Sequence, residues 1–235
     1  MKILCLVPVY NEEANLEKTI ESIEHFPYLV NEFLFINNGS TDKSSKILSK
    51  KNVKTIKLKK NYGIGYAIIL GIEYAINNDF DTIVTIHGGN KMDTRDFKKI
   101  LDPIVYDNFD FVWGSRYLEN SNVNVPKFRK LSIPYLSKII SLFYGIKITD
   151  CTNGFRAYRL DTIKKILPRF NRKWLHGYAF ETFLAGKAYR FKKDLKMIEV
   201  PVTIRYNLGS KNTKIKPIID YPSILLPFFL ARFIE

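Results

Sequence analysis

Cysteine is scarce in this sequence, and no apolar run is long. Its two cysteines, Cys5 and Cys151, provide neither a disulfide framework nor a set of metal ligands, so we expect a reducing compartment. A membrane-spanning helix needs about 20 apolar residues. The apolar segment 221–234 is shorter and is interrupted by prolines and an arginine, which argues against a span there. The apolar run 3–9 soon meets acidic residues, which predicts a first strand and not a signal peptide.

Acidic residues are outnumbered by basic ones. The chain has 37 Lys and Arg against 23 Asp and Glu, a formal net charge of +14. Such an excess favours an anionic partner, such as a phosphorylated substrate, an acidic membrane surface or a nucleic acid. A lysine-rich composition bias is the alternative explanation. With 46% hydrophobic and 26% charged residues, the 235 residues suit one globular α/β domain.

Apolar runs alternate with segments of helical periodicity in the first half of the chain. We expect strands at 3–9, 33–36, 53–58, 82–86 and 109–113, and helices at 11–25, 44–49, 66–76 and 96–105. Continuous apolar runs are typical of strands that are covered on both faces. The alternation predicts an α/β fold with a mostly parallel central sheet and helices on both faces. In such sheets ligands bind beyond the carboxyl ends of the strands.

The second half of the chain is less regular. Further helices are expected at 132–144 and 180–188, and a late strand at 197–204. The helix at 132–144 is rich in apolar residues, and Lys138 is its only charged residue. The apolar segment 221–234 could lie at a membrane interface or dock on the domain.

Six motifs follow one another along the chain. They are PVYNE at 8–12, NNGSTD at 37–42, NYGIG at 61–65, GSRY at 114–117, DCTNGFRAY at 150–158, and EVP at 199–201 with Arg205 and GSK at 209–211. Together they resemble family 2 glycosyltransferases, in the branch of dolichol-phosphate mannose synthases and polyprenyl-phosphate glycosyltransferases. The resemblance covers residues 3–211, and six motifs in the family's order are far more specific than one.

This resemblance implies a glycosyltransferase A-type fold, the fold of nucleotide-diphospho-sugar transferases. It implies a catalytic domain at 1–211, followed by an apolar segment at 212–235 that is a candidate for a membrane interface. Residues implied to bind the nucleotide-sugar are Pro8, Tyr10, Glu12, Ile36, Asn38, Gly88, Gly89, Arg205 and Lys211. The resemblance also implies that Arg116, Arg205 and Lys211 bind the diphosphate, because guanidinium groups bind phosphates in a bidentate manner. Arg129 and Arg156 are candidates for an acceptor phosphate.

The family's metal-binding motif, Asp-x-Asp with a Gln two residues on, is missing. His87, Gly88 and Gly89 stand at its first three positions, and Lys91 stands in place of the Gln. The resemblance implies Mg²⁺ or Mn²⁺ as a cofactor. Such hard ions prefer oxygen ligands, and a histidine and a glycine make a poor site for them.

Three explanations of this replacement stay open. A shifted metal site could use Asp93, the protein could bind without catalysis, or Lys91 could replace the charge of the metal. Charge counting favours the last, because the lost carboxylates and a divalent ion sum to zero, whereas neutral His87 with Lys91 gives +1. An ammonium about 4 Å from a phosphate oxygen contributes about 4 kcal/mol of gross attraction at an effective dielectric near 20. On this hypothesis Lys91, His87 and Arg116 are the catalytic residues.

The expected reaction is an inverting sugar transfer from a GDP- or UDP-sugar to a polyprenyl or dolichyl phosphate, or a related membrane lipid. An acceptor phosphate is already ionised and needs no general base. The apolar helix, the apolar terminus and the net charge suit a protein on the cytoplasmic face of a membrane. The alternatives are transfer to a soluble glycan hydroxyl, with Glu181 or Asp93 as the base, and a catalytically silent nucleotide-sugar-binding protein. A nucleic-acid partner is not expected.

Overall fold

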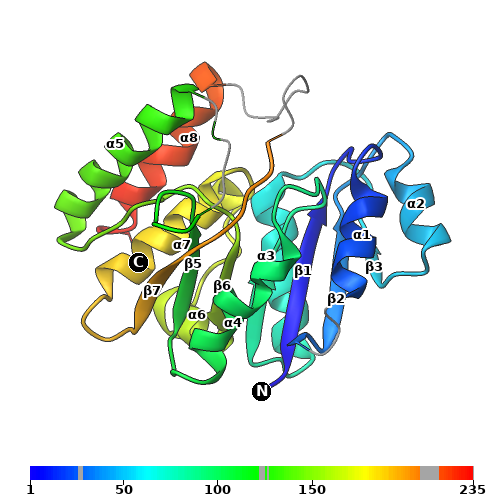
Figure 1. Cartoon of the computed structure of the whole chain (residues 1–235), viewed down its shortest axis with the longest axis horizontal. Coiled ribbons are helices and arrows are strands. Elements are labelled where there is room, and N and C mark those ends of the chain that lie inside the picture. The colour runs from blue at the N-terminus through cyan, green and yellow to red at the C-terminus, as the bar shows by residue number, and fades with distance from the viewer. Residues whose placement is uncertain (26–28, 122–124, 126, 207–216, 235) are drawn as a thin grey trace.

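The chain folds around a seven-stranded sheet flanked by helices (Figure 1). This computed structural model describes residues 1–25, 29–121, 125, 127–206 and 217–234. The strands are β1 (Ile3–Val9), β2 (Glu32–Asn37), β3 (Thr55–Lys57), β4 (Thr82–Thr85), β5 (Phe111–Ser115), β6 (Arg156–Arg159) and β7 (Met197–Pro201). The helices are α1 (Leu16–Glu24), α2 (Ser44–Lys50), α3 (Ile64–Asn77), α4 (Phe97–Val105), α5 (Lys127–Tyr144), α6 (Leu160–Ile166), α7 (Ala179–Arg190) and α8 (Pro217–Leu230).

The strands lie in the order β3-β2-β1-β4-β6-β5-β7. β1 runs parallel to β2 and β4, β3 runs parallel to β2, and β7 runs parallel to β5. β6 runs antiparallel to both of its neighbours, β4 and β5. The expected mostly parallel sheet is confirmed. Because β1, β2 and β4 are parallel, their carboxyl ends meet at one edge of the sheet.

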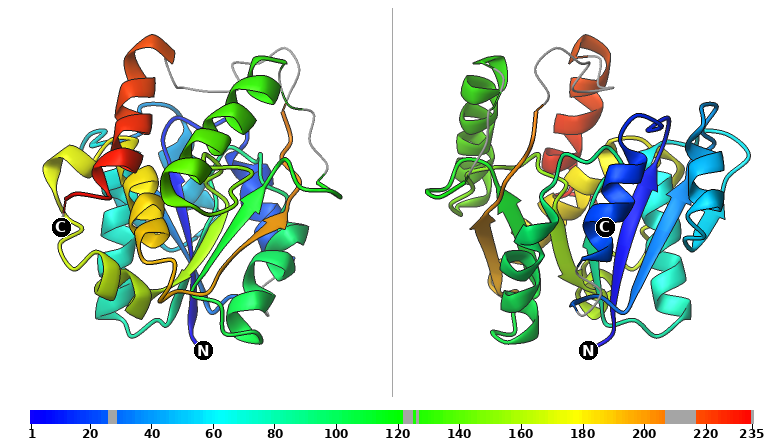
Figure 2. Two further views of the ribbon diagram at one scale, coloured as in Figure 1. Left: turned by 90° about the vertical axis from the view of Figure 1, so that its left-hand side faces the viewer. Right: turned by 45° about the vertical axis from the view of Figure 1, so that its right-hand side comes forward.

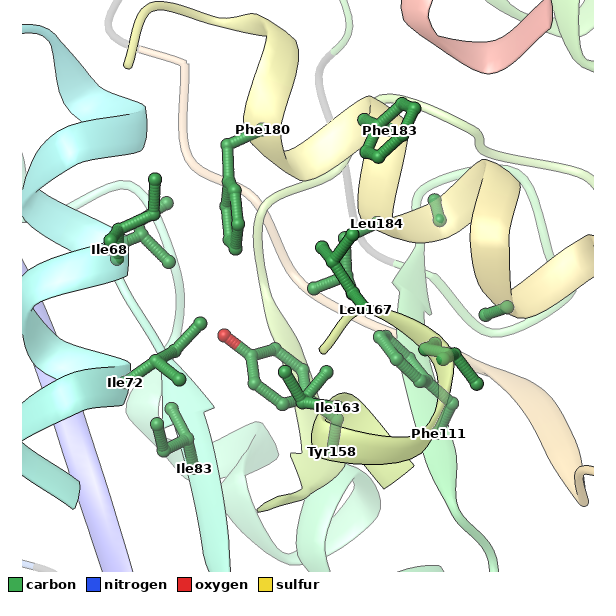
Figure 3. Close-up of a cluster of buried hydrophobic side chains, with 14 of the residues drawn as sticks. Ile68, Ile72, Ile83, Phe111, Tyr158, Ile163, Leu167, Phe180, Phe183 and Leu184 are labelled. Carbon is green, nitrogen blue, oxygen red and sulfur yellow. The ribbon is translucent and has the colours of Figure 1, made fainter. Parts of the chain in front are cut away.

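Helices cover both faces of the sheet, as expected, and each face has its own core. Leu4 and Leu6 of β1 point into a core with α3, α6 and α7, part of which is drawn in Figure 3. Cys5 and Val7 point to the other face, into a core with α1 and α4. All four side chains are fully buried. This alternation follows from the pleat of a strand, and burial on both faces explains the unbroken apolar run in the sequence.

The strands and helices expected in the first half of the chain are all present. Most of their ends shift by one or two residues, but α1 begins at Leu16, five residues later than expected. Residues 11–15 form turns instead, and Asn11 has a left-handed backbone with φ 51°. β6 and α6 lie outside the expected elements. β6 has only four residues with arginine at each end, so it has no apolar run by which to predict it.

The apolar end of the chain forms α8, which packs along α7 (Figures 1 and 2). Phe228 and Ala231 are fully buried, whereas Leu226 and Phe233 are exposed. The Tyr144 hydroxyl at the end of α5 donates a hydrogen bond to the Phe228 carbonyl. This segment therefore docks on the domain with one side and keeps apolar side chains at the surface with the other. Among the residues that the structure describes, no helix is both long enough and apolar enough to cross a bilayer.

Tyr158 of β6 brings a hydroxyl group into the core drawn in Figure 3. Its side chain is 2% exposed, and its hydroxyl has no hydrogen-bond partner among the described residues. Figure 3 shows the hydroxyl directed among Ile68, Ile72 and Phe180. A buried polar group without a partner costs about 1–3 kcal/mol.

We therefore predict that Tyr158→Phe raises the free energy of unfolding by about 1 kcal/mol, because it removes the unsatisfied hydroxyl and keeps the ring. Urea denaturation at neutral pH measures this change. Tyr106→Phe is the matched control, because Tyr106 is 72% exposed, and it should leave stability unchanged. A loss of stability in Tyr158→Phe would show that the hydroxyl has a partner.

Candidate active site

A cavity of about 1050 Å³ opens at the carboxyl ends of β1, β2, β4 and β5. This is the edge of the sheet where an open α/β fold binds its ligands. Further lining comes from the loop before α3, the loop before β6, the start of α7, and from α5 and α8. The lining includes these residues selected from the sequence: Pro8, Tyr10, Glu12, Asn38, His87, Gly89, Lys91, Arg116, Arg129 and Arg156.

The end of β4 is held against the loop that leads into β6. The Thr85 hydroxyl donates a hydrogen bond of 2.7 Å to the Gly154 carbonyl. A Cβ atom on residue 154 would lie 2.9 Å from Nε2 of His87, so the close approach requires glycine. This Nε2 atom is buried and has no hydrogen-bond partner among the described residues. Burial lowers the pKa of His87, which keeps the imidazole neutral at neutral pH.

The two glycines after His87 differ in their surroundings. The Gly88 amide donates to the Pro8 carbonyl at 3.2 Å, and the Gly88 carbonyl accepts from the Thr19 hydroxyl at 2.9 Å. The backbone of Gly88 is therefore used inside the protein, and this residue does not line the cavity. Gly89 does line it, and a Cβ atom there would lie 3.1 Å from Oε2 of Glu12. An aspartate at position 89 would thus face the carboxylate of Glu12.

A divalent metal ion does not fit the residues at the end of β4. Mg²⁺ and Mn²⁺ are bound mainly by oxygen ligands, usually carboxylates. His87 and Gly89 supply no carboxylate, and Lys91 adds a positive charge beside them. In the described part of the chain, no cluster of three or more His, Cys, Asp or Glu residues is arranged to hold a metal ion.

Asp93, the candidate for a shifted metal site, is bound by two arginines. Its carboxylate accepts hydrogen bonds from Arg95 at 2.6 Å and from Arg205 at 2.7 Å. Burial alone would raise the pKa of Asp93, but the hydrogen bonds from Arg95 and the charges of both arginines lower it to about 2. Asp93 also lies outside the cavity lining. The structure therefore gives Asp93 the role of an anchor and does not support a shifted metal site.

The same anchor holds Arg205 beside Lys91. The Arg205 amide donates to the Lys91 carbonyl at 2.7 Å, and Met92 forms a β-bridge with Ile204. Lys91 lines the cavity, whereas the Arg205 side chain is 46% exposed and Arg205 stands outside the lining. Lys211, the third expected phosphate ligand of this region, lies outside the described residues.

Arg116 is buried in a bidentate ion pair. Its Nε and Nη2 atoms donate to Asp150 at 2.6 and 2.7 Å, and it also donates to Tyr206 at 2.6 Å and to Thr152 at 2.7 Å. These bonds use four of the five N–H donors of a guanidinium group. Arg116 lines the cavity but mainly ties the end of β5 to the loop before β6. No sequence pattern marks Asp150 as its partner, although a buried arginine requires a counter-charge.

Asn38 holds the loop before α3 in place with hydrogen bonds. Its amide nitrogen donates to Asn61 Oδ1 and to the Gly63 carbonyl, and its amide oxygen accepts from the Tyr62 amide, each at 3.0 Å. The side chain therefore orders the wall of the cavity. The expectation for Ile36 needs a correction, because its side chain is fully buried in the core and has no surface left for a ligand.

The lining changes character toward α5, α7 and α8. Arg156 is 3% exposed and donates to the Glu181 carbonyl at 2.8 Å. The Arg129 guanidinium lies over the Tyr206 ring, 5.7 Å from its centroid. Beyond these cations the lining becomes mostly apolar, with Ile133, Leu136 and Ile139 from α5 and Ile224 and Leu225 from α8. The cavity thus joins a polar end at the sheet to an apolar end between two helices.

Residues 5–167 match the model of glycosyl transferase family 2. The chain belongs to this family. The resemblance inferred from the six motifs is confirmed, and the protein is a glycosyltransferase.

Relatives of this glycosyltransferase include enzymes that act on lipid phosphates. It is 27% identical over 222 residues to a UDP-N-acetylglucosamine–dolichyl-phosphate N-acetylglucosaminyltransferase of Methanococcus voltae, covering 87% of this chain and 86% of the relative. It is 26% identical over 210 residues to a polyprenol monophosphomannose synthase of Mycolicibacterium smegmatis, covering 86% and 77%.

The fold has solved counterparts. Glucosyl-3-phosphoglycerate synthase from Mycobacterium tuberculosis, solved in complex with UDP, superposes with a TM-score of 0.73 at 16% identity. The match covers 100% of this chain and 81% of the synthase. The glycosyltransferase A-type fold expected from the motifs is therefore confirmed. Other structures of that synthase contain Mn²⁺ or Mg²⁺ with UDP.

In this glycosyltransferase, Asp93 links stability to pH. Its folded pKa of about 2 lies below the ordinary value of 3.8, so its ionised form stabilises the fold above pH about 4. That contribution, about 2 kcal/mol, is lost as the pH falls toward 2.

We predict that the free energy of unfolding of Asp93→Asn falls less steeply than that of the natural protein between pH 5 and pH about 2. Urea denaturation across this range measures the difference. Asp161→Asn is the control, because the Asp161 side chain is 95% exposed, and it should follow the natural profile. Identical profiles for the natural protein and Asp93→Asn would contradict the anchor role.

Proposed function

We propose that the protein transfers a sugar, with inversion, from a GDP- or UDP-sugar to a polyprenyl or dolichyl phosphate or a related membrane lipid. The observation that carries this proposal is the shape of the cavity, which joins a polar end at the sheet to an apolar end between α5 and α8. A donor with a charged diphosphate suits the first end, and a lipid chain suits the second. The activities of the two relatives support the same class of acceptor.

The helices α5 and α8 form the acceptor side. They meet near the Phe143 and Phe229 rings, whose centroids are 5.0 Å apart, and both line the cavity further along. The left panel of Figure 2 shows them diverging above the sheet. A prenyl chain between Leu136 and Leu225 would place its phosphate toward Arg129 and Arg156. In this arrangement residues 1–211 form the catalytic domain, and α8 of the apolar segment completes the acceptor groove with Ile224 and Leu225.

The acceptor phosphate needs no general base, because it is ionised at neutral pH. Transfer to a glycan hydroxyl would need one, and Glu181 is then the candidate. Glu181 lines the cavity, and its Oε1 atom lies 3.1 Å from the Cβ position of residue 154, which also touches His87. The hydroxyl reaction is therefore the second candidate function.

The donor diphosphate is stabilised by protein cations in this proposal. Lys91 stands after the end of β4, where neutral His87 and Gly89 contribute no carboxylate of their own, although the Glu12 carboxylate lies next to Gly89. The leaving diphosphate gains negative charge in the transition state, and a fixed ammonium aimed at it stabilises that charge. The segment that contains Arg205 keeps the Lys91 backbone in place.

An exposed stripe on α5 supports binding to a membrane surface. Phe128, Leu131, Tyr135 and Leu142 are between 63% and 79% exposed, at spacings of three, four and seven residues. They therefore share one face of the helix, which has no partner among the described residues. Together with the net charge of +14, this face suits the anionic cytoplasmic face of a membrane.

The proposed function is tested by incubating the protein with labelled GDP- and UDP-sugars and a short polyprenyl phosphate. We expect label in the organic phase with the phosphate and none with the corresponding polyprenol, because the phosphate is the nucleophile. Arg129→Ala should reduce this transfer. Transfer to a soluble glycan that requires Glu181 would support the second function, and binding without any turnover would support a silent binder.

For Lys91→Ala we predict a fall in kcat of about 10²-fold with a smaller change in KM, the pattern of a lost interaction with the leaving group. Lys91→Arg should keep part of the activity, because it keeps the charge. Lys18→Ala is the matched control, since Lys18 is exposed on α1. An unchanged kcat in Lys91→Ala would contradict the role of this ammonium.

A further inference from the structure

Two consecutive residues after β7 contact different parts of the cavity wall. The Arg205 amide donates to the Lys91 carbonyl at 2.7 Å, on the side proposed for the donor. The Tyr206 hydroxyl accepts a hydrogen bond of 2.6 Å from Arg116, and the centroid of its ring lies 5.7 Å from Cζ of Arg129. Tyr206 is 8% exposed and lies outside the cavity lining, whereas both arginines line it. Tyr206 is therefore a buried support behind two cations of the cavity.

These two arginines differ in what they offer to a phosphate. Arg116 is paired with Asp150 and gives four of its five N–H donors to protein groups. The Arg129 side chain makes no hydrogen bond and no ion pair with a described residue. It lies over the face of the Tyr206 ring, which attracts a guanidinium group within about 6 Å. The N–H donors of Arg129 are therefore not used by the described part of the chain and suit a bidentate phosphate contact.

Tyr117 holds the backbone of the same arginine. Its hydroxyl donates to the Arg129 carbonyl at 2.8 Å. The Arg116 guanidinium lies over the Tyr117 ring, 5.8 Å from its centroid. Tyr117 thus fixes the main chain of Arg129, and Tyr206 fixes its side chain. A cation that is held in place before the ligand arrives loses less conformational freedom when the ligand binds.

The position of Arg129 on α5 indicates which phosphate it meets. Ser132, Ile133 and Leu136 line the cavity, three, four and seven residues further along the helix. At these spacings they share one face of α5 with Arg129. This face therefore places apolar surface beside the cation, which suits a phosphate joined to an apolar chain. A nucleotide diphosphate suits the polar end of the cavity near Lys91 better.

We propose that Tyr206 is a positioning residue for the acceptor phosphate, and that its ring holds the Arg129 guanidinium where this phosphate binds. The inference rests on the proposed function, because it concerns the acceptor of that reaction. Since Arg205 and Tyr206 are consecutive, one piece of chain fixes the Lys91 backbone beside the donor and the Arg129 side chain beside the acceptor. This piece of chain thereby sets the separation of the attacking phosphate from the donor, on which the rate of transfer depends.

Binding of farnesyl phosphate, a short polyprenyl phosphate, tests this role without turnover. In calorimetric titrations Tyr206→Leu, which removes the ring, should bind farnesyl phosphate about tenfold more weakly than the parent. Tyr206→Phe keeps the ring and should bind it like the parent. The affinities for GDP and UDP should stay the same in both variants, because Asp150 still anchors Arg116. A loss confined to GDP and UDP would overturn the assignment to the acceptor.

A double-mutant cycle separates positioning from a general loss of structure. Arg129→Ala should weaken the binding of farnesyl phosphate. Adding Tyr206→Leu to this variant should weaken it no further, because the guanidinium that the ring positions is gone. An equal loss from Tyr206→Leu in the parent and in Arg129→Ala would overturn the positioning role. Binding by Tyr206→Phe that is as weak as that of Tyr206→Leu would overturn the role of the ring.

Tyr74→Leu is the matched control. Tyr74 makes the same two kinds of contact away from the cavity lining, since its hydroxyl bonds to Glu32 at 2.7 Å and Lys54 lies 5.1 Å from its ring centroid. This variant should bind farnesyl phosphate like the parent. Equal binding by the parent and Tyr206→Leu would overturn this inference and leave the proposed function standing. A parent protein that binds no farnesyl phosphate would instead overturn the proposed acceptor, and this inference with it.

Discussion

The pairing of β4 with a strand on each side is the constraint on which the candidate site depends. Parallel pairing with β1 brings the loop containing Glu12 to the end of β4. Antiparallel pairing with β6 brings Gly154 against His87 and places Arg156 opposite Thr85. The polar end of the cavity is therefore assembled by backbone hydrogen bonds of the sheet. Side-chain substitutions within it can change its chemistry without changing its position.

That separation is consistent with an intact fold in which His87, Gly88 and Gly89 stand where the resemblance implies a metal motif. Two carboxylates near the site form ion pairs with arginines and are therefore not available to a cation. Asp93 is bound by Arg95 and Arg205, and Asp150 is bound by Arg116. Lys91 then adds a positive charge at the edge of the cavity in which we propose that the donor diphosphate binds. The proposed exchange of a metal ion for an ammonium is consistent with all of these pairings.

The motifs allowed the fold to be predicted, and the candidate cavity opens at the strand ends, which are visible in the sequence as polar loops after apolar runs. Individual roles were harder to predict. Ile36, Asn38 and Arg116 were expected to bind the nucleotide-sugar. Ile36 is a core residue instead, and Asn38 and Arg116 form most of their hydrogen bonds with neighbouring loops. Their partners, such as Asp150, are distant in the sequence and follow only from tertiary packing. The groove between α5 and α8 likewise depends on packing that apolar composition alone does not specify.

In our proposal the donor site binds a nucleotide diphosphate without a metal ion. Calorimetric titration of GDP and UDP into chelator-treated protein, with and without added Mn²⁺, tests it most directly. We expect at least one of the two nucleotides to bind with the same Kd in both conditions, since Lys91 supplies the charge at the end of β4. Binding that appears only when Mn²⁺ is added would contradict this claim and would show that the site uses a metal ion.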